Sequence, residues 1–550
     1  MGNALPEIKE VTGLKKAKVT IHPEYAIGPI DKRLFSGYME PLGNLVYGGI
    51  WNPDHPEADE LGLRKDVMKA IQEFGVPAVR LPGGNVTSGW NWKDSIGPRE
   101  KRKQHLDLAW RQYEPNWVGH DEYLAWARRC GMEPMYTVNM GTGTIEDAMH
   151  CIEYTNHPGG TYWSDLRRKN GFTAPHNVKT WYLGNEMDGP WQIHSWEKDP
   201  KGYGVKINEA AKALKWVDPS ITTVASGTST PLNHTYPQWD VDVLEECYEN
   251  IDMLSLHYYH NVPEGDMAAF MSAPAVFEEF IRTEIAACDF VQAKLCSPKQ
   301  ITISFDEFGV GFAPAGKTAP GRKGRIPHET YGEFSEQNLN RPFREIDPNH
   351  WPERKGKNKG SQMLGAIASA AVMMTFLRHS DRIKIGCMTG SFLGALSINR
   401  EHVWKSIGYY PFKHYLEYAN GISLLPSVKS PSFCADGFNI NEFYQCHPYE
   451  NIPYIQAGAA YDEEKGELSI FLLNLNWEEA MEVELDVRGF EGYRLKEHIE
   501  LYSNDPSAAD TWENPDAVLP KKNSNTSFHD GKIELTAQKL SWNVIRLTKE

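Results

Sequence analysis

The sequence lacks any long uninterrupted apolar run, although 41% of its 550 residues are hydrophobic. A membrane-spanning helix needs about 20 consecutive apolar residues, so we expect no membrane partner. The first residues, Met1–Glu7, contain neither the basic segment nor the apolar segment of a secretion signal. We therefore expect a cytoplasmic protein, an expectation that a leader removed from the chain would change.

Cysteine pairs and positive charge are also scarce. The eight cysteines are scattered, with no Cys-x-x-Cys pair, which argues against a zinc finger and against a disulfide framework. Lys and Arg number 57 against 73 Asp and Glu, a formal net charge of −16. Because an acidic surface repels phosphate backbones, we expect no nucleic-acid partner. The charge is compatible with a neutral substrate such as a glycan.

Short runs rich in β-branched and aromatic residues alternate with amphipathic stretches over the first 420 residues. The strand-like runs are Leu34–Glu40, Val76–Pro82, Glu133–Asn139, Lys179–Asn185, Thr222–Ser226, Asp252–Tyr258, Ile301–Glu307 and Ile383–Thr389. The helical stretches include Arg64–Phe74, Gly119–Cys130, Tyr203–Val217 and Gln362–Arg378. Eight strand–helix alternations predict the α/β class and a (β/α)8 TIM barrel.

Beyond the barrel, short strand-like runs separated by turn residues predict a C-terminal all-β sandwich domain. The strand-like Lys18–His22 precedes the barrel, and we expect it to pair with the sandwich. We therefore divide the chain into an N-terminal strand segment (1–24), a catalytic barrel (25–420) and a β-sandwich domain (421–550). The polar stretch Ala313–Lys359 is long for a loop in a compact domain, and a loop of that length is usually a lid, an interface or a disordered segment.

Two of the barrel runs end in glutamates. The fourth run leads directly into Glu186, and the seventh ends at Glu307. A single glutamate is usually a solvated surface charge, but both of these follow apolar strands, whose carboxyl ends meet at the mouth of a barrel. Glycoside hydrolysis requires such a pair, because one carboxyl protonates the leaving oxygen while the other attacks or activates water. We interpret Glu186 and Glu307 as a catalytic pair.

Longer motifs carry a resemblance to a known family. They are Trp181–Gln192, Arg80–Asn85 followed by Gly89–Trp92, Glu40–Ile50, Leu106–Trp110 and Tyr409–Phe412. These motifs, long and ordered along the chain, resemble those of glycoside hydrolase family 51, the α-L-arabinofuranosidases. The fold of that family, a (β/α)8 barrel with a β-sandwich, agrees with the pattern of strands and helices above.

The resemblance implies a retaining, exo-acting hydrolase that releases terminal α-L-arabinofuranosyl residues from arabinan, arabinoxylan or derived oligosaccharides. It implies Glu307 as nucleophile and Glu186 as general acid/base. It further implies no cofactor, no metal and a homohexamer.

Eight further residues match substrate-binding positions of the family. They are Glu40, Arg80, Asn85, Trp110, Asn185, Trp191, His257 and Tyr259. Arg80 would lie under the nucleophile and keep that carboxylate ionised, or else form a buried structural ion pair. Trp110 and Trp191 would wall the pocket, or else belong to the core.

Two positions depart from the family pattern. Phe308-Gly309 follow the nucleophile where Trp and Asn are usual, and Gly390 stands where a sugar-binding Gln is usual. Both changes remove polar groups near the sugar, so a shifted specificity stays open, toward galactofuranosides or toward β-1,4-linked glucan or xylan. A non-catalytic glycan-binding protein is the other alternative. The pair His257-x-x-His260 is only a weak metal-binding pattern.

Overall fold

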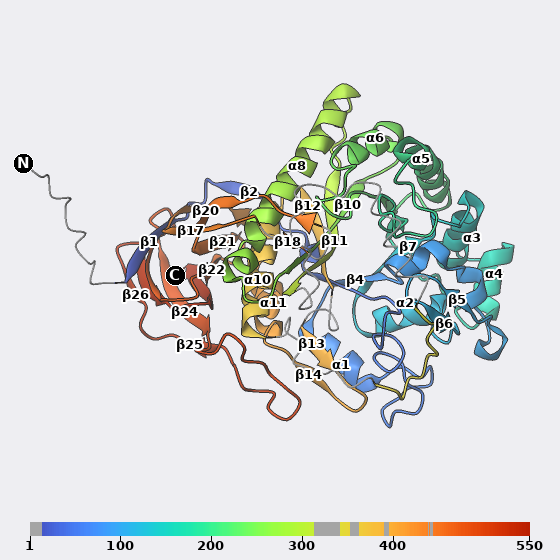
Figure 1. Ribbon diagram of the computed structural model, residues 1–550, viewed down its shortest axis with the longest axis horizontal. Helices are drawn as coiled ribbons and strands as arrows, with labels where there is room; N and C mark the ends of the chain where they lie inside the picture. The colour runs from blue at the N-terminus through green and yellow to red at the C-terminus, as the bar shows by residue number, and fades with distance from the viewer. Residues whose placement is uncertain are drawn as a thin grey trace, which may run out of the picture.

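The protein is described from a computed structural model, which covers residues 14–312, 341–351, 362–389, 395–437, 439–440 and 444–549. It consists of a barrel with surrounding helices and, beside it, a β-sandwich (Figure 1). The predicted long loop, Ala313–Lys359, lies largely outside the described residues. Among the helices that the structure describes, none is both long enough and apolar enough to cross a membrane.

The barrel is a closed sheet in which each strand pairs with its neighbours in the order β10-β11-β12-β3-β4-β7-β8-β9. The pairs are parallel throughout. The strands are β3 Ser36–Tyr38, β4 Ala78–Leu81, β7 Glu133–Val138, β8 Thr180–Leu183, β9 Thr222–Ser226, β10 Met253–Val262, β11 Thr302–Phe312 and β12 Ile383–Met388. Each coincides with one of the eight predicted runs, which confirms the predicted fold class.

Strand ends differ from the sequence pattern for local reasons. β4 is confined between Pro77 and Pro82, neither of which has a backbone N–H for the ladder. β3 begins late because Asp31 caps a 3-10 turn, η1 Lys32–Leu34. β10 and β11 instead continue past the barrel as a two-stranded parallel ribbon that pairs as far as Val262 and Phe312. This ribbon extends the sheet on the side of the mouth that carries Glu307.

Helices cover the outside of the barrel. Their bounds are α1 Lys65–Phe74, α2 His120–Arg129, α3 Ile145–Asn156, α4 Tyr162–Lys169, α5 Pro200–Val217, α6 Gln238–Cys247, α7 Met267–Met271, α8 Ala273–Lys294, α10 Met363–Leu377 and α11 Tyr409–Tyr418. Four short pieces complete the barrel loops: η2 Asn85–Gly89, η3 Trp92–Ser95, η4 Arg99–Lys101 and the strand pair β5 His105–Asp107 and β6 Gln112–Glu114.

α10 joins the barrel to the sandwich. It contacts β11 and β12 on one side and β21, β22 and β28 on the other, so it is buried almost all round. Its sequence is accordingly apolar on every face, as expected of a helix without a solvent side. Gly458 on β21 lets the sheet approach closely, because a Cβ there would lie 3.1 Å from Met374 of α10.

Two sheets form the sandwich. The seven-stranded sheet has the order β2-β15-β21-β22-β28-β24-β25, and the five-stranded sheet has the order β16-β1-β23-β27-β26. Their strands are β1 Lys15–Thr20, β2 Ala26–Pro29, β15 Ile422–Leu424, β16 Ser427–Lys429, β21 Ile455–Asp462, β22 Glu467–Asn474, β23 Met481–Asp486, β24 Tyr493–Leu501, β25 Lys521–Lys522, β26 Ser527–His529, β27 Lys532–Ala537 and β28 Ser541–Lys549. Smaller strand pairs are β13 Leu396–Ile398 with β14 Val403–Lys405, β17 Ser432–Ala435 with β20 Tyr449–Pro453, and β18 Asn439–Ile440 with β19 Tyr444–Gln445.

The N-terminal strand belongs to the sandwich although it is far from it in sequence. β1 pairs in parallel with β23 and antiparallel with β16, and in Figure 1 it lies at the end of the molecule opposite the barrel helices. β2 pairs antiparallel with β15, so residues 26–29 also join a sandwich sheet. The domain boundaries at residues 24 and 420 stay a prediction.

Candidate active site

Glu186 is aimed into the barrel mouth by a tight turn at the end of β8. Gly184 has φ +100°, and a Cβ there would lie 2.9 Å from Met187. Glu186 itself adopts φ +48°, a left-handed conformation that a residue other than glycine rarely adopts. The backbone N–H of Met187 donates to Ser226 at the end of β9, 3.1 Å away. The turn is thereby tied to the neighbouring strand, and Glu186 is only 8% exposed.

An irregularity in β11 turns two consecutive acidic residues toward the same cation. The register of β11 shifts against β12 between Phe305 and Phe308, as in a β-bulge. In a regular strand Asp306 and Glu307 would face opposite sides of the sheet. Here Asp306 Oδ2 lies 2.8 Å from Arg80 Nε, and Glu307 Oε1 accepts from Arg80 Nη1 at 2.7 Å.

Arg80 is completely buried at the base of the site. Its third contact is a hydrogen bond of 2.6 Å to Asn185 Oδ1, and its guanidinium lies over the Tyr182 ring, 4.9 Å from the centroid. Burial alone would lower the pKa of Arg80, but Asp306 and Glu307 raise it above its ordinary value. Burial would likewise raise the pKa of Asp306, and Arg80 and His257 hold it below its usual range. Arg80 therefore combines the two predicted roles, as a structural ion pair and as the cation beneath Glu307.

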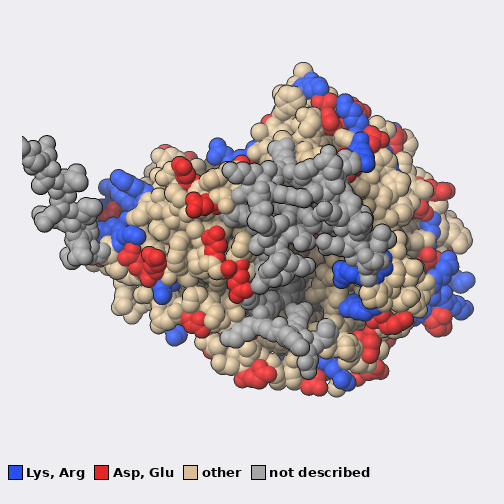
Figure 2. Space-filling view, in the orientation of Figure 1, with Lys and Arg blue, Asp and Glu red and all other residues tan. Residues whose placement is uncertain are grey.

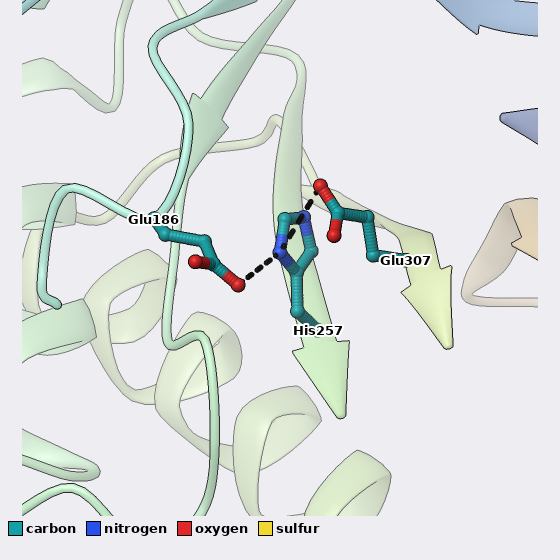
Figure 3. A group of neighbouring side chains, drawn as sticks. All are labelled: Glu186, His257 and Glu307. Carbon is teal, nitrogen blue, oxygen red and sulfur yellow. Dashed lines mark hydrogen bonds and ion pairs between the residues drawn. The ribbon is translucent and has the colours of Figure 1, made fainter. Parts of the chain in front are cut away.

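His257 stands between the two glutamates (Figure 3). Its Nδ1 lies 3.1 Å from Glu186 Oε1 and 3.7 Å from Glu307 Oε1, and its Nε2 lies 3.2 Å from Asp306 Oδ2. Burial alone would lower the pKa of His257, but Glu307, Asp306 and Glu186 raise it to about 10. At neutral pH the ring is therefore a cation that donates from both nitrogens.

The two glutamates approach each other closely. One carboxylate oxygen of Glu186, one of Glu307 and one ring nitrogen of His257 lie within 4.8 Å of one another. Tyr259 donates from its hydroxyl to Glu307 Oε2 at 2.7 Å, and Trp191 donates from Nε1 to Glu186 Oε2 at 2.5 Å. Each carboxylate thus has partners on both oxygens.

Glu40 forms a third acidic position at the end of β3. It accepts from Trp110 Nε1 at 2.6 Å, from the Tyr38 hydroxyl at 2.8 Å and from the Val86 N–H at 3.3 Å. Burial and, after it, the charge of Glu307 raise the pKa of Glu40 to about 8. Gly84, the second glycine of the Gly83-Gly84 turn, is required here, because a Cβ on it would lie 2.4 Å from the Glu40 carboxyl.

The two amides of the site contact each other. Asn185 donates from Nδ2 to Asn85 Oδ1 at 2.9 Å. Asn85 begins the short helix η2, and Asn185 precedes Glu186, so the contact joins the loops after β4 and β8. Eight of the ten predicted site residues therefore belong to one network of hydrogen bonds and ion pairs. Glu40 and Trp110 bond each other beside it, and the ring of Tyr38, which bonds Glu40, lies 5.7 Å from the Arg80 guanidinium. Trp110 and Trp191 are partly exposed and contact the carboxylates of Glu40 and Glu186, which favours the pocket wall over the core.

Sequence reasoning missed several members of this network. Asp306, Tyr38 and Gln192 contact predicted site residues directly, and Ser88 contacts Gln192. Asp306 was hidden because strand alternation places it outward, and the signal for Gln192 was its position in the motif that contains Glu186. Phe308, by contrast, does not face the site. It is buried outside the barrel against Phe376 of α10.

The group Glu186, His257 and Glu307 is spaced so that it could hold a metal ion. A protonated imidazole has no lone pair for a metal, and the three carboxylates around His257 keep it protonated. The ion pairs account for the spacing. His260 does not join this group, because it faces the other side of β10 and bonds through Nε2 to the carbonyl of Ala269, 2.9 Å away.

Comparison with known proteins decides the family. Residues 70–278 match the α-L-arabinofuranosidase 1 domain, and residues 335–541 match the α-L-arabinofuranosidase C-terminal domain. An intracellular exo-α-(1→5)-L-arabinofuranosidase 1 of Bacillus subtilis is 38% identical over 98% of this chain and 100% of its own length. The chain belongs to glycoside hydrolase family 51. The resemblance inferred from the motifs is thus confirmed.

Other members of family 51 are similar over the same length. An exo-α-(1→6)-L-arabinofuranosidase of Bifidobacterium longum is 32% identical over 97% of this chain and 98% of its own. The structure of a family 51 α-L-arabinofuranosidase from Bifidobacterium longum superposes with a TM-score of 0.83, at 29% identity, over 98% of this chain and 100% of the other.

Of the departures from the family 51 pattern, Gly390 lies outside the described residues. Gly309 pairs with Tyr259 in the ribbon of β10 and β11 and is partly exposed. A Cβ on Gly309 would lie 3.2 Å from the edge of the Tyr259 ring and 3.5 Å from Thr389 Oγ1. Position 309 is therefore closely packed against Tyr259, a residue that contacts Glu307, and an added side chain would require the Tyr259 ring to shift slightly.

Proposed function

We propose that this protein is an exo-acting α-L-arabinofuranosidase that hydrolyses its substrate with retention of anomeric configuration. The observation that carries the proposal is the approach of Glu186 and Glu307, whose nearest oxygens lie within 4.8 Å. Retaining glycosidases separate their carboxyl groups by about 5–5.5 Å, and inverting enzymes by about 6.5–9.5 Å, to leave room for water. The short separation supports direct attack by one carboxylate.

The contacts of the two glutamates support the roles that we propose for them. Glu307 is held on Oε1 by Arg80 and on Oε2 by Tyr259, which suits an ionised nucleophile that attacks the anomeric carbon. As the bond to the leaving oxygen breaks, Glu186 transfers its proton to that oxygen. In the second step water attacks the anomeric carbon, its proton goes to Glu186, and the bond to Glu307 breaks.

The charges of the buried cluster fit this proton movement. Arg80 and protonated His257 supply two positive charges for the three carboxyls of Glu186, Asp306 and Glu307. Asp306 contacts both cations and its pKa is lowered, so it stays ionised. Because there is one more carboxyl than there are cations, one carboxyl can gain or lose a proton while each buried cation keeps an ionised partner. We assign that group to Glu186, which alone of the three lacks an arginine contact among the described residues.

The names of the relatives support arabinofuranose as the sugar, because the two curated relatives both act on α-linked L-arabinofuranosyl groups while their linkages differ. We therefore propose arabinofuranose-containing oligosaccharides or polysaccharides as substrate. The lack of a polar side chain at Gly309, where the family pattern has Asn, supports one alternative, a pocket that also accepts a larger furanose such as galactofuranose. Cleavage of β-1,4-linked glucan or xylan and non-catalytic glycan binding have no comparable observation in their favour.

A panel of aryl glycosides tests the proposal. We expect rapid hydrolysis of an aryl α-L-arabinofuranoside, slower hydrolysis of the β-D-galactofuranoside and none of the pyranosides. Proton NMR of the first-formed product, or of the methyl glycoside formed in methanol, should show the α anomer. A β anomer, or no turnover of any furanoside, would refute the assignment.

A matched variant tests the alternative. Gly309→Asn introduces a polar side chain beside Tyr259, whose ring must shift slightly to accommodate it, and Gly311→Ala serves as a control farther along the same face of the ribbon. If the lack of a side chain at position 309 is what admits a larger sugar, Gly309→Asn should raise the ratio of kcat/KM for arabinofuranoside over galactofuranoside. An unchanged ratio would contradict the wider pocket.

We further propose a cytoplasmic homohexamer. The name of the Bacillus subtilis relative includes the word intracellular, and all eight cysteines of this chain are free thiols, six of them buried. Figure 2 shows groups of acidic and of basic side chains interspersed around the rim of this face. The hexamer rests on the family resemblance alone, and a monomeric mass by light scattering at micromolar concentration would refute it.

A further inference from the structure

A continuous line of hydrogen bonds runs from the loop after β4 to Arg80. Ser88 donates from Oγ to Gln192 Oε1 at 2.7 Å, and Gln192 donates from Nε2 to Asn85 Oδ1. Asn185 also donates from Nδ2 to Asn85 Oδ1, at 2.9 Å, and accepts on Oδ1 from Arg80 Nη2 at 2.6 Å. We call these four side chains, Ser88, Gln192, Asn85 and Asn185, the amide relay.

The direction of the amide relay follows from the chemistry of Arg80. A guanidinium has only donors, so the atom of Asn185 that faces it must be the carbonyl oxygen. The amide nitrogen of Asn185 then faces Asn85, which must present its own oxygen. The two ends of an amide have nearly the same shape, and without such a partner either orientation would fit.

Gln192 closes the relay from the other side. Because Asn85 presents its oxygen, Gln192 must direct its amide nitrogen there and turn its own oxygen toward Ser88. The Ser88 hydroxyl is the donor that satisfies this oxygen. Ser88 is 1% exposed and Gln192 is 6% exposed, so water is poorly placed to replace either partner. Asn85 is thus held by two donors on one oxygen.

These hydrogen bonds engage the amide oxygen of Asn85 and leave its amide nitrogen, Nδ2, for another partner. Its side chain is partly exposed, and among the hydrogen bonds of the described residues none uses its Nδ2. We propose that Ser88 and Gln192 are positioning residues that orient Asn85 with its amide nitrogen toward the sugar, so that this part of the pocket recognises a hydroxyl oxygen as hydrogen-bond acceptor. This inference rests on the proposed function. It adds that Asn85 is the donor in its contact with the sugar, and that Ser88 and Gln192 fix this direction.

The decisive variant is Gln192→Glu. It places an acceptor against Asn85 Oδ1 while Asn185 still directs a donor to the same oxygen, so Asn85 can no longer satisfy both neighbours and should lose its fixed orientation toward the sugar. Gln192→Met keeps the length of the side chain and removes its polar atoms, and Ser88→Ala removes the donor that orients Gln192. Loss of one hydrogen bond to the sugar should lower kcat/KM about 10- to 100-fold in Gln192→Glu, with smaller losses in the other two.

Deoxygenated substrates separate positioning from structural damage. The three variants and the wild type are assayed with an aryl α-L-arabinofuranoside and with its 2-deoxy, 3-deoxy and 5-deoxy analogues. One analogue lacks the hydroxyl that Asn85 holds, and we expect its kcat/KM to be nearly the same in all four proteins. For the other three substrates, kcat/KM should fall most in Gln192→Glu and less in Gln192→Met and Ser88→Ala. Thermal unfolding of each variant reports on folding, and Gln192→Met replaces Gln192→Glu if the latter does not fold.

The outcomes are distinct. Equal losses on all four substrates, or activity of Gln192→Glu within about threefold of the wild type, would overturn the amide relay and leave the proposed hydrolase intact. A wild type that hydrolyses no arabinofuranoside would overturn the proposed function together with the inference. A single insensitive analogue would support the relay and would also identify the hydroxyl that faces Asn85.

Discussion

Tyr259→Phe is the sharpest single test of the nucleophile assignment. The change removes one hydroxyl, which donates to Glu307 Oε2 at 2.7 Å, and leaves the Arg80 contact on Oε1 in place. A hydrogen bond to a charged group contributes about 1.5–3 kcal/mol, which corresponds to about 10- to 150-fold in rate. Tyr259 is partly exposed, so water can replace part of the contact, and we expect a loss near the lower end.

The assay compares kcat/KM for aryl α-L-arabinofuranosides with good and poor leaving groups. Because Tyr259 contacts the nucleophile and not the acid, the loss should be similar for both. Tyr258→Phe is the matched control, since Tyr258 is the neighbouring residue on β10, faces outward and bonds His260 at 3.1 Å. It should lower stability and leave kcat/KM within about twofold. Equal kinetic losses in both variants, or none in Tyr259→Phe, would refute the assignment.

Three further predictions concern the buried cluster. Glu307→Gln removes the attacking charge and should lower activity by several orders of magnitude, with azide restoring turnover of an activated substrate as the inverted glycosyl azide; near-normal activity would contradict the role. Glu186→Ala should spare substrates with good leaving groups in the first step while the glycosyl-enzyme accumulates in mass spectra, and equal losses for good and poor leaving groups would indicate a binding role only. His257 has a folded-state pKa raised from 6.5 to about 10, so its stabilising contribution is complete below pH 6.5 and is lost as the pH rises through about 10. Chemical denaturation across this range should show a fall in the free energy of unfolding that is smaller in His257→Gln, and parallel pH profiles would exclude the effect.

Much of the architecture was accessible from sequence because it depends on short-range pattern. Eight apolar runs separated by amphipathic stretches can bury both faces only as a parallel sheet covered by helices, and each run coincides with a barrel strand. The same pattern places Glu186 and Glu307 at strand ends, and a closed barrel brings strand ends together. The motifs around Arg80, Asn185 and Glu186 were sufficient to indicate the family.

What the pattern could not determine depends on geometry across strands. Regular alternation turns Asp306 away from the site, and only the register shift in β11 brings it to Arg80 and His257. The extension of β10 and β11 beyond the barrel arises from pairing between the two strands, which neither strand reveals alone.

The sequence by itself determined where the eight barrel strands lie, which family the chain resembles and which carboxyls meet at the barrel mouth, because each of these follows from residues close together along the chain. The tertiary structure alone decided the charge of His257, the raised pKa of Glu40 and the direction of the amide relay. The physical reason is that protonation and hydrogen-bond polarity depend on burial and on partners that come from different strands. Arg80 imposes its polarity on Asn85 through Asn185, and no spacing within one segment records that contact.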